Sequence, residues 1–229
     1  MTDDRTGGRQ AHQLPPGRHG LSRSFVAQNQ RERILAAVAD VTSAGSYAEL
    51  TVEGIIVTAG VSRRTFYEHF KNKDEAFLAA YDEIAALLVQ RVFAAQEVPS
   101  GFAEKAVAGL GTFLDFLASE PAFARMCIVE VLAAGQEAIT RRNNVMKAFA
   151  DLIDYNAREM LDDGVSTALT AETIVGGIYE VVYGRVLRGE IKELPGLLPE
   201  LAYSALLPYL GPETAAAERR RLLEGQQAA

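Results

Sequence analysis

The chain has 229 residues, is 48% hydrophobic and carries a formal net charge of −7 at pH 7. It can therefore bury a sizeable core, and its charge argues against a protein that coats nucleic acid indiscriminately. The charge is uneven, because residues 1–73 contain ten Lys and Arg against seven Asp and Glu, and residues 74–229 contain thirteen against twenty-three. This split predicts one small DNA-facing surface on an acidic body.

The compartment can also be predicted from composition. The single cysteine, Cys127, excludes an internal disulfide framework and fits a reducing cytosol. There is no run of 18 apolar residues and no apolar signal core near the N-terminus. We therefore expect a cytoplasmic protein without a membrane span.

Residues 1–23 are rich in Gly, Pro, Arg and polar side chains, so we expect a disordered basic arm. Two interpretations of this arm stay open: Arg18, His19 and Arg23 could reach a DNA minor groove, or the segment could be a solvated tail.

A first helix is predicted from about Ser24 to Gly45, with an apolar stripe that includes Ile34 and Val38.

Residues 51–73 predict two short helices that meet at a tight turn. Gly60 is suited to the left-handed conformation that ends the first helix, while Thr51 and Ser62 are suited to cap the two helices. In the second helix, Phe66 and Phe70 fall on the core side, which leaves an outward face of Arg63, Arg64, Thr65, Tyr67 and His69. Two helices joined by a short Gly-containing turn are typical of a helix-turn-helix DNA-binding domain, which we place at residues 24–73.

A long helix is predicted from Asn72 to about Gln96, because Asn72 with Glu75 three residues later resembles a capping box. Beyond residue 101 the pattern is helical throughout. We expect an all-α protein of about nine helices, with a ligand-binding and dimerisation domain at 74–211 and a flexible tail at 212–229.

The segment Ala171–Arg188 is apolar nearly all round, which predicts a helix buried on every side. Together with a last helix at about 199–210, kinked by Pro208, it is our candidate dimer interface, although both helices could simply complete a monomeric core. The interface residues expected are Ile174, Ile178, Val181, Val182 and Leu206.

Aromatic and methionine side chains in the body are the candidate ligand site, since cavities form between helices lined by such residues. The candidates are Phe113, Phe116, Phe123, Met126, Phe149 and Tyr179. An ordinary apolar core is the alternative. Arg125, Glu130 and Arg158 would be polar anchors if they turn inward.

The motif AGVSRRTFYEHFKNKDEAF at residues 59–77 is similar to the signature of the TetR family of transcriptional regulators, and the resemblance covers about residues 31–91. It implies a homodimeric repressor that binds a palindromic double-stranded DNA operator and is released by a small, apolar or aromatic effector. It also implies that Arg63, Arg64 and Thr65 contact base edges and that Tyr67, His69 and Lys73 contact phosphates, assisted by Thr51 and Ser62. Glu68 would repel phosphate and should point away or accept from cytosine.

Other functions are less well supported. The three histidines have no metal-ligand spacing, and no nucleotide-binding or nucleophile motif occurs, so we expect no enzyme, metal or cofactor. Cys127 could be a redox sensor or a small core residue. A DNA-binding regulator or architectural protein without a small-molecule ligand remains the main alternative.

Overall fold

The computed structural model describes residues 22–161 and 168–227. Within these ranges every regular element is helical, and no β-strand occurs, which confirms the predicted all-α class. The helices in chain order are α1 (Arg23–Ala44), α2 (Val52–Ala59), α3 (Arg63–His69), α4 (Lys73–Ala94), α5 (Phe102–Ser119), α6 (Pro121–Ile128), the 3₁₀ helix η1 (Glu130–Ala133), α7 (Gln136–Met160), α8 (Ala168–Leu187), η2 (Ile191–Leu197) and α9 (Leu198–Gln227).

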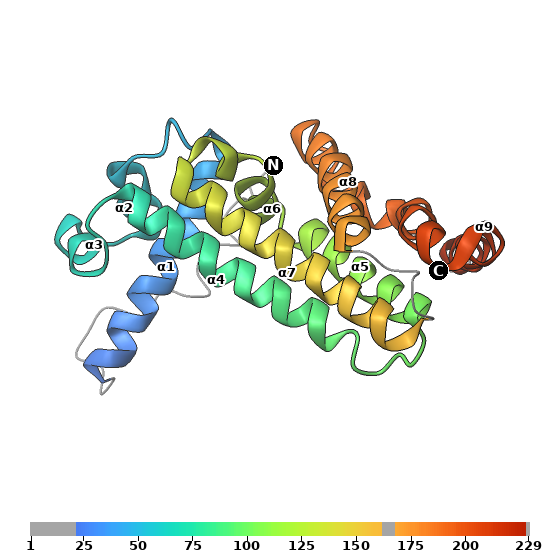
Figure 1. Ribbon diagram of the computed structural model, residues 1–229. Helices are drawn as coiled ribbons and strands as arrows, with labels where there is room; N and C mark the ends of the chain where they lie inside the picture. The colour runs from blue at the N-terminus through green and yellow to red at the C-terminus, as the bar shows by residue number, and fades with distance from the viewer. Residues whose placement is uncertain (1–21, 162–167, 228–229) are drawn as a thin grey trace.

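Helices α1, α2 and α3 form the N-terminal end of the molecule (Figure 1). The caps predicted from the sequence are present: Thr51 Oγ1 accepts from Gly54 N at 3.0 Å, and Ser62 Oγ accepts from Thr65 N at 3.0 Å. Gly60 ends α2 with φ 62° and ψ 40°, the left-handed conformation that glycine adopts without Cβ strain. Local sequence thus fixes both helix starts and the turn between them.

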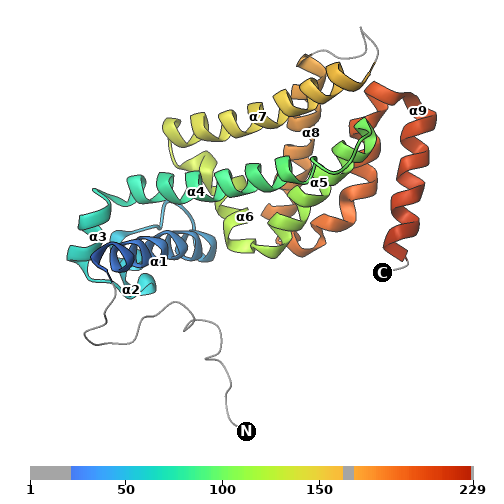
Figure 2. The same ribbon diagram turned by 90° about the horizontal axis from the view of Figure 1, so that it is seen from below.

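Helix α4 connects this end to the rest of the chain. Asn72 caps it by accepting from Glu75 N at 2.8 Å, and the helix then runs for 22 residues, or about 33 Å. It lies beside α7 along much of its length (Figures 1 and 2). One rigid element therefore begins next to α3 and ends deep in the C-terminal half.

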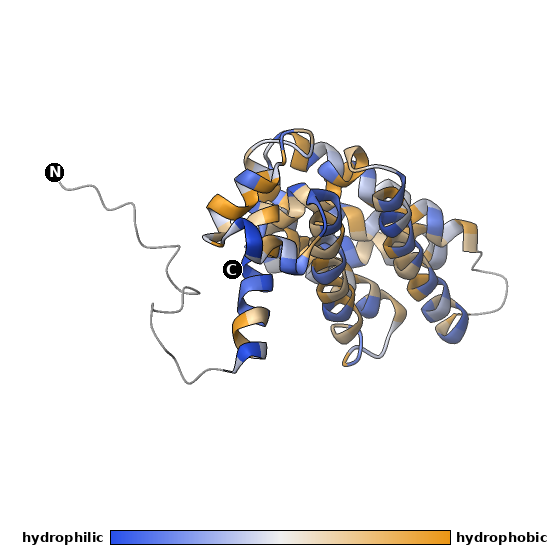
Figure 3. Ribbon diagram, turned by 90° about the vertical axis from the view of Figure 1, so that its left-hand side faces the viewer, coloured by the Kyte–Doolittle hydropathy of each residue, from blue (hydrophilic) through white to orange (hydrophobic). Residues whose placement is uncertain are grey.

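The larger of two apolar clusters extends from the N-terminal helices into the C-terminal half. One cluster of buried residues includes Ile34 and Phe66 near the N-terminus, Phe77 on α4, and Leu114 and Val186 in the C-terminal half. The helices carry hydrophilic and hydrophobic residues in alternation (Figure 3), as expected where one face packs on a core and the other meets water. Because the core is close-packed, a shift on one side of it displaces its neighbours.

Two expectations for the last helices are wrong. Helix α8 is not buried on every side, since Gly177, Val181 and Leu187 are exposed. The break in α9 lies at Gly211, with φ 76° and ψ 171°, and not at Pro208.

The expected flexible tail is also wrong for residues 212–227, which are helical. Ala215 in this segment is fully buried, and Arg219 Nε donates to Glu200 at 2.8 Å. The expected N-terminal arm at 1–23 lies, apart from its last two residues, outside the described ranges. None of the described helices is long and apolar enough to span a membrane.

Candidate DNA interface and ligand cavity

Helix α3 presents a cationic, aromatic face at one end of the molecule. Phe66 and Phe70 are buried beneath it, so Arg63, Arg64 and Tyr67 project outward and are exposed. Ser62 is exposed at its N-terminus, where its hydroxyl also lies 2.9 Å from that of the half-buried Thr65. A helix with guanidinium groups on its outer face has the chemistry to read a major groove.

Both arginines of α3 are paired with carboxylates in the free protein. Arg63 lies 2.5 Å from Glu53 on α2, and this hydrogen bond is the main reason that the pKa of Arg63 is raised. Arg64 pairs with Glu68 at 2.9 Å, one turn further along α3. Since all four side chains are well exposed, these pairs are weak and a phosphate or guanine can replace them. The carboxylate of Glu68 is thus directed to Arg64.

Lys73 is half-buried and already bound to another part of the protein. Its Nζ donates to the carbonyl of Tyr47 at 3.3 Å and lies 4.9 Å from the centroid of that ring. The Tyr47 hydroxyl donates to Asp74 at 2.6 Å, and burial together with this bond raises the pKa of Tyr47 to about 12. Lys73 therefore braces the loop between α1 and α2.

The structure changes the expected burial or role of other side chains near the outward face of α3. His69 is half-buried against Phe70, with ring centroids 6.3 Å apart, whereas Lys71 is an exposed cation not predicted to contribute. Arg33 on α1 donates to the carbonyls of Ala59 and of Gly60, the latter at 2.9 Å. It thereby supplies hydrogen-bond donors to backbone carbonyls at the C-terminal end of α2.

A cavity of about 130 Å³ lies in the C-terminal half, between α4, α5, α6, α7, α8 and α9. Its wall includes five of the six residues expected from the sequence, namely Phe113, Phe116, Phe123, Phe149 and Tyr179. Met126 does not line it and is instead completely buried in the core, so that assignment is wrong. The remaining wall is mostly aliphatic.

Arg142 on α7 is a charged group of this wall that sequence reasoning missed. Its guanidinium lies 3.9 Å from the centroid of the Tyr179 ring. Burial raises the pKa of Tyr179, and Arg142 partly opposes this shift. The spacing could have identified it, since Arg142, Val145, Met146 and Phe149 share one helical face and all four line the cavity.

The three polar anchors suggested by the sequence face elsewhere. Arg158 is exposed and pairs with Asp154 at 2.8 Å. Arg125 pairs with Glu130 at 3.4 Å, and the buried Glu130 is directed away from the cavity toward the N-terminal helices. Cys127 lines the cavity, where burial raises the pKa of its thiol, so its environment disfavours the reactive thiolate.

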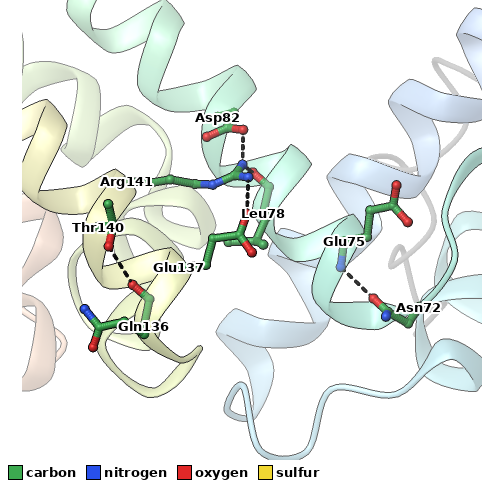
Figure 4. Close-up of polar contacts among 8 residues, drawn as sticks. All are labelled: Asn72, Glu75, Leu78, Asp82, Gln136, Glu137, Thr140 and Arg141. Carbon is green, nitrogen blue, oxygen red and sulfur yellow. Dashed lines mark hydrogen bonds and ion pairs between the residues drawn. The ribbon is translucent and has the colours of Figure 1, made fainter.

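Two sets of contacts connect the cavity walls to the α1–α3 end or to α4. Tyr179 donates to the carbonyl of Ile128 at 2.6 Å, at the end of α6, and two residues later Glu130 accepts from the backbone N–H of Tyr47 at 2.9 Å. On the other side, Arg141 of α7 binds Asp82 and the carbonyl of Leu78 on α4, as well as Glu137 at 2.7 Å (Figure 4).

Most of the expected dimer residues do not lie on a free surface. Val182 and Leu206 are buried within the protomer and offer no surface to a partner, whereas the half-buried Ile174 and Ile178 line the cavity. Val181 alone is exposed, at 41%. Sequence periodicity did not separate the two sides of α8, because small and apolar residues such as Gly177 and Val181 also occur on its exposed side, beside Glu172 and Glu180.

The chain matches both a protein-family model and solved structures. Residues 34–80 match the family model of bacterial regulatory proteins, tetR family. FadR, a fatty acid degradation regulator from Bacillus halodurans, is similar with a TM-score of 0.70 and 22% identity, covering 80% of this chain and 96% of that one.

Two further solved structures share the fold. FadR from Bacillus subtilis, in complex with stearoyl-CoA, has a TM-score of 0.68 and 20% identity, covering 79% of this chain and 98% of that one. SmeT, the repressor of the Stenotrophomonas maltophilia multidrug efflux pump SmeDEF, has a TM-score of 0.65 and 20% identity, covering 80% of this chain and 91% of that one. At such identities the likeness establishes the fold alone.

Proposed function

Because its residues 34–80 make the chain a member of the TetR family of transcriptional regulators, we propose that it is a ligand-responsive repressor. In this proposal a homodimer binds a palindromic operator and leaves it when a small molecule fills the cavity. The observation that carries the proposal is the combination of an exposed arginine pair on α3 with an apolar cavity that shares walls with α4 and α6. The family and the fold are those of regulators rather than of enzymes.

For DNA reading we assign residues 24–73, and within them the exposed face of α3. Arg63 and Arg64 are proposed to leave Glu53 and Glu68 and to bind guanine edges bidentately. Thr65 would add a base contact, and Thr51, Ser62, Tyr67 and His69 would contact phosphates. Lys73 is proposed to act mainly by bracing the Tyr47 loop, and the exposed Lys71 becomes an additional phosphate ligand.

For dimerisation we propose the outward face of α8 together with α9, within a body that extends from residue 74 through α9. Thr173, Gly177 and Val181 lie four residues apart on α8 and are all exposed, and Leu207 on α9 is exposed at 37%. A Cβ built on Gly177 meets no atom within 4 Å, so that surface is open in the protomer. Glycine allows a partner helix to approach closely, as a helix–helix contact between two copies requires.

The cavity is proposed as the effector site. Its aromatic and aliphatic wall favours a small, largely apolar molecule. The similar fold of the FadR protein solved with stearoyl-CoA supports the idea that such a body can enclose an apolar ligand. Filling the cavity would displace α4 and α6, which are joined to the DNA-binding helices. A coupling of about 1–3 kcal/mol would change operator affinity about 5–150-fold.

The experiment that tests the DNA assignment begins with selection of a bound sequence from a random duplex pool. Fluorescence anisotropy then compares Arg63→Ala and Arg64→Ala with the wild type on that sequence. We expect each substitution to cost about 1–3 kcal/mol and to relax specificity at one base pair. Arg220→Ala is the matched control, because Arg220 is exposed on α9 at the opposite end of the molecule. Unchanged affinity in both α3 variants would refute the assignment.

A further inference from the structure

The cavity contains a single charged side chain among the described residues that line it. That residue is Arg142, and the other lining groups are aliphatic or aromatic apart from Gln96 and Cys127. Gln96 is already engaged, since its Oε1 accepts from Asn156 at 2.7 Å. Among the described wall residues, Arg142 is therefore the one whose charge can attract an anionic ligand.

The charge of Arg142 is not compensated by a carboxylate. No Asp or Glu among the described residues lies within 4.0 Å of its guanidinium, its Nε is buried without a hydrogen-bond partner, and its Nη1 donates to the neutral amide oxygen of Asn143. The preceding residue, Arg141, shows the contrast, because it pairs with both Asp82 and Glu137. Burying this charge costs free energy. Stacking on Tyr179 offsets part of that cost, since an aromatic face attracts a cation.

Arginine stays protonated at any physiological pH, so the site cannot reduce this cost by losing a proton. A guanidinium binds a carboxylate with two parallel hydrogen bonds, which would supply the partner that the Nε lacks. The site is thus complementary to a ligand with an anionic group at one end.

The dimensions of the cavity indicate the size of the ligand. A volume of about 130 Å³ holds about ten water-sized groups at 10–15 Å³ each. The cavity residues on α7 run from Arg142 to Ile153, eleven positions or about 16 Å along the helix. Beyond Arg142 this face of α7 is apolar, with Val145, Phe149 and Ile153 along the wall.

We propose that the effector is a medium-chain carboxylic acid whose carboxylate binds Arg142 and whose alkyl chain lies along α7 toward Ile153. This inference rests on the proposed function, because it takes the cavity to be the effector site. It adds the chemical class of the effector and names Arg142 as the residue that selects the acid over a neutral molecule of the same length.

The test compares decanoate with 1-decanol by isothermal titration calorimetry, both below the concentrations at which they aggregate. Decanoate should bind the wild type, and Arg142→Met should weaken this binding about 10-fold or more while leaving decanol binding unchanged. Arg142→Lys keeps the positive charge but loses the two parallel N–H donors of the guanidinium. Its decanoate affinity should therefore lie between those of the wild type and Arg142→Met. Arg158→Met is the matched control, since Arg158 lies on the same helix but outside the cavity.

The thermal midpoint of the ligand-free variants separates recognition from a structural role. Removal of an uncompensated cation should leave the midpoint of Arg142→Met unchanged or raise it. A lower midpoint with equal decanoate affinity in the wild type and Arg142→Met would overturn the inference, as would the absence of decanoate binding to the wild type. If decanol and decanoate release the selected DNA equally well, the effector site stands and the selection of an acid is refuted.

Discussion

Glu130 offers the sharpest test of how the two ends of the molecule are joined. Its side chain is 7% exposed and it contacts two different parts of the chain. One carboxylate oxygen accepts from the backbone N–H of Tyr47, in the loop between α1 and α2, at 2.9 Å, and the other lies 3.4 Å from Arg125. Replacing Glu130 should therefore loosen the loop that leads into the helix-turn-helix.

The magnitude follows from the two contacts. A hydrogen bond to a charged group contributes about 1.5–3 kcal/mol, and Glu130→Ala would leave the Tyr47 N–H without its acceptor. The loss of the Arg125 pair adds little, because Arg125 is 31% exposed and can turn to water. We expect Glu130→Ala to lower the free energy of opening of this loop by about 2 kcal/mol. Glu130→Gln keeps an acceptor and should cost about 1 kcal/mol.

Amide hydrogen exchange at Tyr47 is the direct assay, because it reports local opening without any ligand or DNA. A loss of about 2 kcal/mol corresponds to exchange about 30-fold faster in Glu130→Ala. Anisotropy with the selected DNA should show weaker binding in the same variant.

The control is Asp151→Ala, which removes an exposed carboxylate that pairs with Lys147 one turn earlier on α7. It should change global stability little and leave exchange at Tyr47 unaltered, because an exposed ion pair contributes little. If Glu130→Ala exchanges at Tyr47 as slowly as the wild type, the contact does not hold the loop, and the connection through α6 is refuted.

Three further predictions concern other parts of the molecule. Ser62→Ala removes the N-cap of α3 and should cost about 0.5–2 kcal/mol in chemical denaturation; an unchanged midpoint would show that this cap is dispensable. Val181→Glu should give a monomer in sedimentation velocity while Val98→Glu, at a 92% exposed loop position, should not; a dimer in both would place the interface elsewhere. Since the pKa of Tyr47 is raised from 10.0 to about 12, its contribution to stability is fully present below pH 10 and is lost as the pH rises toward 12. Tyr47→Phe should remove this part of the decline in unfolding free energy over that window, and an identical decline in both proteins would contradict the role of the Asp74 bond.

The DNA-binding helices could be predicted from sequence because the interactions that define them are local. Thr51, Ser62 and Asn72 each cap a helix through an amide three residues later, and Gly60 needs only its own backbone freedom. The outward position of Arg63 and Arg64 follows from helical spacing against the buried Phe66. Their pairing is partly local as well, because Glu68 is one turn from Arg64.

The tertiary structure decided the features that depend on partners distant in the chain. The fold brings Glu130 to Tyr47 across 83 residues, and it turns Arg142 toward the cavity while the adjacent Arg141 binds α4. It also decides which apolar residues of α8 line the cavity and which, like Val181, stay exposed, because this depends on how the neighbouring helices pack against α8. Side-chain identity and helical period determine which face a residue occupies, and only the packing of helices decides what that face meets.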